Sequence, residues 1–219
     1  MSFGLGRGRT LEPGAHGIEG RSLPDPALGR VDPRSWFPNP GRRFELEIGS
    51  AKGTFLLQQG ELEPEVNFLG IEYAGEFYRY AADRVRRRGL ANVRLLYADA
   101  NEFIRAWMPD AIVATIHLYF SDPWPKSRHH KRRVVQLATL EEFHRILVPG
   151  GDLRLVTDHE ELWTWYLEHE AQVRHRFDRE EFAPPASAGE GEVVGTNWER
   201  KLRREGKPFH SMVLRKRGT

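Results

Sequence analysis

The chain of 219 residues contains no cysteine. Disulfides, thiolate metal sites and cysteine nucleophiles are therefore excluded together, and the composition is compatible with a reducing compartment. The sequence also lacks an apolar run long enough to cross a membrane, and its first residues lack the apolar core of a signal peptide. We therefore expect a soluble, cytoplasmic protein that has no membrane partner.

Clusters of metal ligands are also lacking in the sequence. His129 and His130 are adjacent, which does not match the spacing of metal ligands, and no further cluster of histidines completes a site. We therefore expect no metal. His117 lies inside an apolar run, and we interpret it as a core residue with satisfied hydrogen bonds rather than as a base.

Positive charge is clustered, although the formal net charge is only +2. Basic runs occur at residues 84–88, 126–133, 200–207 and 215–217. Clustered cations favour a polyanionic partner because they gain from the release of condensed counterions. For the run at 84–88 we favour the alternative, a solvated helix face. The run at 200–207 is equally compatible with RNA contact and with a solvated surface.

The sequence divides into two parts. Residues 1–41 are rich in glycine, proline and arginine without periodicity, which predicts a mostly flexible N-terminal arm. The end of this arm, Trp36 to Pro38, could dock on the core or touch the substrate. We expect residues 42–219 to form one domain.

In this domain, short apolar runs alternate with segments of helical periodicity. The apolar runs predict strands at 44–48, 67–72, 93–98, 112–120, 152–157 and 208–216. The helical periodicity predicts helices at 54–62, 74–88, 134–147 and 160–175. Repeated βα units indicate an α/β fold with a mostly parallel sheet and helices on both faces. Ligands of such sheets bind beyond the carboxyl ends of the strands.

Acidic and small residues stand at three successive strand ends. Gly49 and Gly53 allow a tight turn after the first strand, and Glu47 precedes that turn near the place of an amino-acid ammonium group. Glu72 closes the second strand, where it can accept hydrogen bonds from ribose hydroxyls, and Asp99 closes the third, where it can accept from an adenine amine. Three carboxylates suit an ammonium and a sulfonium but repel a pyrophosphate, so the pattern favours S-adenosylmethionine over a dinucleotide. The alternative is that acidic residues simply favour helix N-caps.

The segment Ser121 to Arg133 places one carboxylate, Asp122, at the start of a basic and partly aromatic loop. No acidic residue follows before Glu141. Its cations can hold phosphates, Trp124 offers a stacking surface, and Asp122 can meet a polar or positive group on a base. The segment therefore indicates chemistry on a base that is carried by a phosphate backbone.

Taken in order and spacing, these features resemble the bacterial tRNA (guanine-N7-)-methyltransferases from about residue 44 to residue 216. Residues 122–133 are similar to the family's D-P-W-x-K-x-R-H-x-K-R-R signature, and residues 196–199 are similar to its T-x-[FW]-E motif. The resemblance implies a Rossmann-like S-adenosylmethionine-dependent methyltransferase fold. Its sheet would be mostly parallel and seven-stranded, with helices on both faces and an antiparallel last strand.

The resemblance also implies methyl transfer to N7 of a guanosine in the tRNA variable loop. By position, Glu47, Glu72, Asp99 and Asp122 would contact S-adenosylmethionine, and Asp122 would also be the catalytic residue. The residues that would face the tRNA are Lys126, Arg128, His129, His130, Lys131, Arg132, Arg133, Asp158, Thr196, Asn197, Trp198 and Glu199. One departure from the family pattern lies in the cofactor loop, where Ala51 replaces a usual glycine.

The chemistry of guanine agrees with this interpretation. N7 has a free in-plane lone pair, so the reaction requires positioning and charge stabilisation rather than a strong base. Two alternatives stay open. An amino-group nucleic-acid methyltransferase would carry [N/D]-P-P-[F/Y/W] at this strand end, whereas the order here is Asp-Pro-Trp-Pro. A catalytically inactive RNA-binding protein would gain nothing from carboxylates in a basic cleft. The chain could act as a monomer or as a homodimer.

Overall fold

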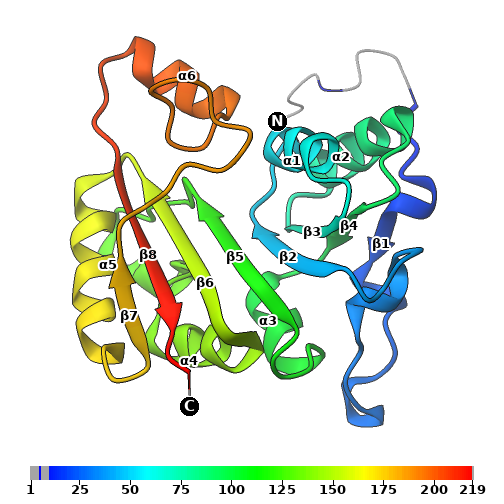
Figure 1. Cartoon of the computed structure of the whole chain (residues 1–219), viewed down its shortest axis with the longest axis horizontal. Helices are drawn as coiled ribbons and strands as arrows, with labels where there is room; N and C mark the ends of the chain where they lie inside the picture. Colours follow the sequence, from blue (N-terminus) through cyan, green and yellow to red (C-terminus); the bar gives the residue numbers. More distant parts are fainter. Residues whose placement is uncertain (1–4, 6–9, 219) are drawn as a thin grey trace.

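The computed structural model describes residue 5 and residues 10–218. They contain one eight-stranded sheet with the order β1-β4-β3-β2-β5-β6-β8-β7 (Figure 1). The strands are β1 (Gly17–Glu19), β2 (Arg43–Ile48), β3 (Val66–Glu72), β4 (Val93–Tyr97), β5 (Val113–Tyr119), β6 (Leu147–Thr157), β7 (Phe177–Glu180) and β8 (His210–Lys216). Strands β1 to β6 pair in parallel, and β8 lies antiparallel between β6 and β7. The expected fold class and the antiparallel last strand are confirmed.

Helices cover both faces of this sheet (Figure 1). They are α1 (Thr54–Leu62), α2 (Gly75–Arg88), α3 (Ala100–Ala106), α4 (Leu137–Ile146), α5 (Glu160–Val173) and α6 (Asn197–Arg204). Side chains of α3, α4 and α5 share one hydrophobic cluster with the sheet, and side chains of α1 and α2 share a second one. α6 instead lies beyond the end of the sheet at which β5 and β6 end (Figure 1).

The alternating pattern of β2 explains how polar groups enter the interior. Phe44, Leu46 and Ile48 belong to the larger hydrophobic cluster, whereas the intervening Glu45 and Glu47 are buried although they are polar. Successive side chains of a strand point to opposite faces, so both glutamates lie on the second face of the sheet. There Glu45 Oε2 lies 2.8 Å from Nε2 of His117, whose Nδ1 lies 2.7 Å from the Tyr119 hydroxyl. His117 is therefore a satisfied core residue, as its position in an apolar run predicts.

Residues 10–41 differ from the flexible arm that their composition predicts. β1 adds an eighth strand to the expected seven by pairing with β4. Val31 N–H donates to the Trp107 carbonyl at 2.8 Å, and Trp107 Nε1 donates to the Pro24 carbonyl at 2.8 Å. Phe37 is 4% exposed, so the end of the arm docks on the core. Isolated strand pairing and single buried aromatics hold this segment, and neither produces a periodic sequence pattern. Residues 1–4 and 6–9 of the predicted arm lie outside the described residues.

Candidate active site

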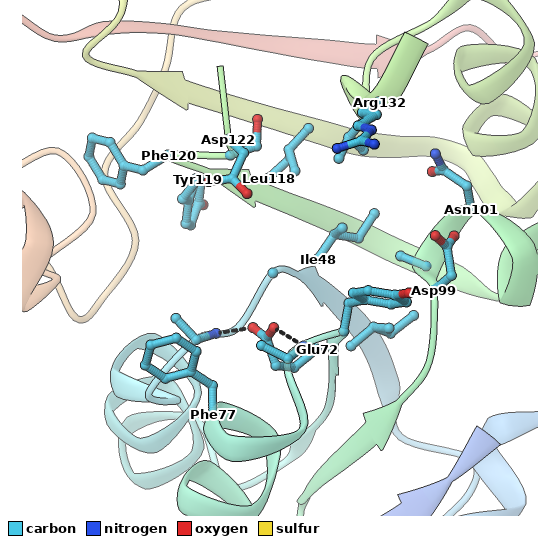
Figure 2. A pocket seen from close by; sticks show the side chains of 18 of the residues that line it. Ile48, Glu72, Phe77, Asp99, Asn101, Leu118, Tyr119, Phe120, Asp122 and Arg132 are labelled. Atoms are coloured by element: carbon cyan, nitrogen blue, oxygen red, sulfur yellow. Dashed lines mark hydrogen bonds between the residues drawn. The ribbon is translucent and has the colours of Figure 1, made fainter. Parts of the chain in front are cut away.

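A cavity of about 370 Å³ lies at the carboxyl ends of the central parallel strands (Figure 2). It is lined by the last residues of β2, β3 and β5, by residues that follow β2, β3 and β4, and by residues of the basic segment Ser121 to Arg133. Those that carry polar groups or shape the walls are Gly49, Ala51, Glu72, Tyr73, Phe77, Asp99, Asn101, Tyr119, Phe120, Asp122, Trp124, Arg132 and Val134. Ligands of parallel sheets bind at this edge, so the cavity is the candidate ligand site.

The turn between β2 and α1 brings backbone groups to the cavity wall. Gly49 and Ala51 line the cavity and have φ angles of 77° and 46°. The N–H of Ala51 donates to Glu72 Oε2 at 2.7 Å. Gly53, which we expected to contact the cofactor, does not line the cavity. It is buried at the start of α1, where a Cβ atom would lie 2.9 Å from that of Ala81, so Gly53 serves helix packing.

Two glutamates lie close together at the base of the site. Glu72 lines the cavity, is 8% exposed, and accepts a second hydrogen bond from Ala74 N–H at 2.7 Å (Figure 2). Glu47, which we also expected to contact the cofactor, does not line the cavity; it is buried and directly precedes Ile48, which does. Burial, and then the charge of Glu72, raise the pKa of Glu47 to about 8. Within the described part of the chain, Glu47 Oε2 is buried without a hydrogen-bond partner, which is unfavourable unless a ligand donates to it.

Asp99 is a helix cap, and its position also leaves it accessible to a ligand. Its carboxylate caps α3 by accepting a hydrogen bond from Glu102 N–H at 3.0 Å, and it also lines the cavity. Asn101 and Arg132 lie near it on the same side of the cavity (Figure 2). A capping carboxylate keeps unused lone pairs, so Asp99 can still accept a hydrogen bond from a ligand.

Asp122 stands at the end of β5, across the cavity from Glu72 (Figure 2). It is exposed, and nothing in the described ranges forms a hydrogen bond or ion pair with its carboxylate. The backbone on either side is strained, because Phe120 and Trp124 have positive φ angles of 54° and 43°. Non-glycine residues in this region cost free energy and are concentrated at functional sites. The charge of Asp122 adds to burial, the larger cause, in raising the pKa of Glu72.

The basic loop contains the short 3-10 helix Ser127–Arg132, and its cations have different surroundings. Lys126, Arg128 and Lys131 are exposed, and the described residues provide them with no ion-pair partner. Arg132 lies over the Trp124 ring at 4.9 Å and lines the cavity with it.

We expected Arg133 and His130 to face the tRNA, but both side chains pack against the protein. Arg133 is only 1% exposed, so its guanidinium lies inside the protein and is not accessible to tRNA. The ring of His130 packs against Trp165 at a centroid distance of 5.4 Å, while His129 packs edge-on against Trp124. The side chain of Arg133, and in part that of His130, therefore holds the loop against the protein.

The late motif at residues 196–199 is also divided between structure and surface. Thr196 caps α6 by accepting from Glu199 N–H at 3.1 Å. Glu199 is fully buried and accepts hydrogen bonds from the N–H groups of residues 193–195, so its carboxylate does not face a substrate as predicted. Asn197 and Trp198 are exposed, and Trp198 is 48% exposed. None of these four residues lines the cavity, nor does the half-buried Asp158 after β6.

Sequence reasoning missed several cavity residues. Tyr73 and Asn101 follow the predicted strand-end carboxylates by one and two positions, which is the signal that could have identified them. Trp124 and Arg132 line the cavity although the basic loop suggested only RNA contact. Across the described ranges there is no group of three or more metal-ligating side chains, and no helix is long and apolar enough to cross a membrane.

Comparisons with solved structures agree with this architecture. The aminoglycoside resistance methyltransferase NpmB1 is 15% identical, with a TM-score of 0.58 over 80% of this chain and 87% of that one. The 16S rRNA methyltransferase KamB is 14% identical, with a TM-score of 0.58 over 85% of this chain and 91% of that one. At these identities the likeness concerns the fold alone.

Comparisons of sequence are more specific. A family model described as "Putative methyltransferase" matches residues 42–212. Three relatives carry the name tRNA (guanine-N(7)-)-methyltransferase. That of Nitrobacter hamburgensis is 38% identical over 78% of this chain and 68% of its own length. That of Geobacillus kaustophilus is 40% identical over 66% of each chain, and that of Halorhodospira halophila is 33% identical over 88% of this chain and 82% of its own length. The chain therefore belongs to the tRNA (guanine-N(7)-)-methyltransferase family.

Proposed function

We propose that this protein transfers a methyl group from S-adenosylmethionine to N7 of a guanosine in the tRNA variable loop. The observation that carries the proposal is the placement of Asp122. Its carboxylate lies at the edge of a cavity that holds two further acidic side chains, and exposed cations follow it within a few residues. Both the names of the relatives and the chemistry of guanine support this assignment.

The residues of the cavity fit S-adenosylmethionine. Glu72 and Asp99 line the cavity and offer acceptors for ribose hydroxyls and the adenine amine. Glu47 does not itself line the cavity, but it directly precedes the cavity-lining Ile48 and offers a buried, unpaired carboxylate oxygen for the ammonium group. Gly49 has no side chain and lines the cavity with its backbone, and its φ of 77° lies in the left-handed region that favours glycine. The volume lies in the range of small-molecule sites, about 300–1,000 Å³. When bound, this cofactor supplies an electrophilic methyl group on a sulfonium.

The remaining chemistry belongs to N7 and Asp122. N7 would form its bond to the methyl carbon with its own lone pair while the methyl–sulfur bond breaks; the electrons of that bond remain on sulfur, which leaves as the neutral thioether, so no proton has to leave. The purine ring gains positive charge in the process, and the Asp122 carboxylate stabilises that charge. A carboxylate that is fixed in advance at the site of developing charge is among the strongest contributions that a protein can make. Asp122 is available because no described residue pairs with it.

The tRNA would be held outside the cavity. Lys126, Arg128 and Lys131 are exposed beside the Asp122 segment and can contact phosphates. The exposed Trp198 ring of α6, with the Lys201 ammonium 5.0 Å from its centroid, offers a stacking surface beyond the end of the sheet. These contacts would set affinity and position, whereas the cavity sets which atom reacts.

Methyl transfer from labelled S-adenosylmethionine to unmodified tRNA tests the proposal. The modified nucleoside is identified by mass spectrometry, and its position is mapped by nuclease digestion. We expect N7-methylguanosine in the variable loop, and we expect Asp122→Asn to be strongly impaired. A methylated exocyclic amine would favour the amino-group alternative. Cofactor binding without a product would contradict the substrate assignment, and the absence of cofactor binding would favour an RNA-binding protein.

A further inference from the structure

We propose that Arg133, Glu161 and Tyr166 form a clamp that positions Asp122 by holding the residue on each side of it, Ser121 through its hydroxyl and Pro123 through its carbonyl. The inference rests on the proposed function, because it assigns these side chains a task in presenting the Asp122 carboxylate. It also gives Arg133 a different task from that of its exposed neighbours in the basic loop.

One arm of the clamp holds the residue after Asp122. Arg133 Nε donates to the Pro123 carbonyl at 2.9 Å, and its Nη2 donates to Glu161 Oε1 of α5 at 2.5 Å. The guanidinium also lies over the Trp165 ring at 4.8 Å. Glu161 and Trp165 are four residues apart and therefore share one face of α5. The arginine thus links the Asp122 loop to a helix that is packed on the sheet.

The second arm holds the residue before Asp122. Ser121 Oγ and the Tyr166 hydroxyl share a hydrogen bond at 2.8 Å. Tyr166 is 1% exposed and belongs to the main hydrophobic cluster, so its hydroxyl has a fixed position. Asp122 therefore stands between two residues that are both anchored to α5, while its own carboxylate remains free for a ligand.

Backbone strain explains why such anchoring is needed. Phe120 and Trp124, with positive φ angles, are the residues immediately outside the two anchored positions. Each such residue costs on the order of 1 kcal/mol or more and persists only where the surroundings determine it. Without the clamp, the segment could relax toward ordinary φ angles, and the Asp122 carboxylate would leave the cavity edge.

The burial of Arg133 decides between this task and phosphate binding. Its side chain is 1% exposed and already uses donors in two directions, toward a carbonyl and a carboxylate. A guanidinium can serve both partners in one plane, whereas a lysine ammonium on a flexible stem holds them less precisely. Arg133→Lys should therefore keep the charge and lose the geometry.

A double-mutant cycle tests the clamp. Arg133→Lys and Tyr166→Phe are each combined with Asp122→Asn, and methyl transfer is measured in a single turnover at saturating tRNA and cofactor. We expect Arg133→Lys to slow the rate about tenfold and Tyr166→Phe several-fold in the wild-type background, with cofactor and tRNA Kd within about twofold. In the Asp122→Asn background, each change should cost less than about twofold, because residues that act through one group are not additive.

A matched control separates positioning from general damage. Arg94 is also buried and donates to the Trp36 carbonyl at 3.0 Å; it lies in β4, which β3 and β2 separate from β5, the strand that leads to Asp122. Arg94→Lys should lower Tm as Arg133→Lys does but leave the single-turnover rate unchanged. Tyr166→Phe keeps the aromatic ring, so it provides a folded variant even if Arg133→Lys does not fold.

A second measurement does not depend on activity. Hydrogen exchange of the peptide that covers residues 119–126 should be faster in Tyr166→Phe than in the wild type, without any substrate. Unchanged exchange would overturn the clamp even if wild-type activity is normal. Full rate losses that persist with Asp122→Asn, or a weaker tRNA Kd with a normal saturated rate, would also overturn it. A wild-type protein that makes no N7-methylguanosine would instead contradict the proposed function, and the exchange result would still decide the clamp.

Discussion

The proposed cofactor side of the site (Glu47, Glu72 and Asp99) and its proposed RNA side (Lys126, Arg128 and Lys131) hold their charged groups in opposite ways. On the cofactor side, Glu72 and Asp99 are tied to backbone N–H groups, and Glu47 is buried with one oxygen unpaired. On the RNA side, Lys126, Arg128 and Lys131 are exposed, and the described chain offers them no ion-pair partner. A small, defined ligand suits groups that are fixed in advance, whereas a long polyanion suits mobile cations that lose little when it dissociates.

Asp122 lies where the two sides meet, and its removal should have the largest effect. We expect Asp122→Asn to lower the single-turnover rate about 100-fold or more, because the amide keeps the shape but loses the charge that stabilises the purine. The Kd for S-adenosylhomocysteine, measured by calorimetry, should change less than about fivefold. Near-normal turnover in the Asn variant would show that shape rather than charge matters at this position.

Glu47 tests the cofactor side through its pKa. The folded-state pKa of about 8 lies above the ordinary value of 4.5, so the folded protein keeps a proton that the unfolded chain has lost. The stabilising contribution is complete below about pH 4.5 and is lost as the pH rises through 8. The free energy of unfolding without cofactor should therefore fall across this window, by at most about 1.4 kcal/mol per pH unit.

Glu47→Gln should remove that dependence. The free energy of unfolding is measured by urea titration at pH 6 and pH 8.5. The wild type and the variant should differ more in how this free energy changes between the two pH values than in its size at either one. The same variant should bind S-adenosylmethionine about tenfold more weakly at pH 8, since it cannot pair with the ammonium group. An unchanged cofactor Kd would place the ammonium elsewhere in the cavity.

The RNA side should respond to single cations with smaller effects. Lys126→Ala or Lys131→Ala should each raise the Kd for tRNA about three- to tenfold. Each should also reduce, by about one, the slope of the logarithm of the binding constant against the logarithm of the salt concentration. Arg88→Ala is the matched control, because Arg88 belongs to another basic run but pairs with Glu61 at 2.7 Å. The Kd values are measured by filter binding at several salt concentrations. An Arg88→Ala variant that weakened tRNA binding as much as Lys126→Ala would contradict the prediction.

The basic runs also show what the sequence predicts well and what it does not. The parallel sheet and the strand-end carboxylates follow from periodicity and from the rule that ligands bind at strand ends, and the structure brings Glu72, Asp99 and Asp122 to one cavity. Arg132 and Arg133 are identical neighbours in the sequence, yet one lines the cavity and the other is buried under α5. That difference depends on Glu161 and Trp165, which are distant in the sequence, so local patterns contain no trace of it.

Short elements were missed for a related reason. α3 and β7 have seven and four residues, too few to show a periodic pattern. In α6 the residues are mostly charged, and the helix depends on the Thr196 cap and on the contacts of Glu199 with the preceding loop. Residues 10–41 likewise pack through individual long-range contacts. Composition describes the average preference of a segment, and here tertiary contacts override it.

Ala51 should give the smallest effect. It occupies the left-handed region with φ of 46°, where an alanine is disfavoured by about 1–2 kcal/mol relative to ordinary helical or extended backbone. Ala51→Gly relieves that strain, but glycine also gains freedom in the unfolded chain, which offsets about 0.4–1 kcal/mol. We therefore expect a net gain in the free energy of unfolding of no more than about 1 kcal/mol, measured by urea titration, with the cofactor Kd nearly unchanged. The Ala51 N–H donates to Glu72 in either variant, so a large change in Kd would mean that the alanine methyl group itself shapes the cofactor site.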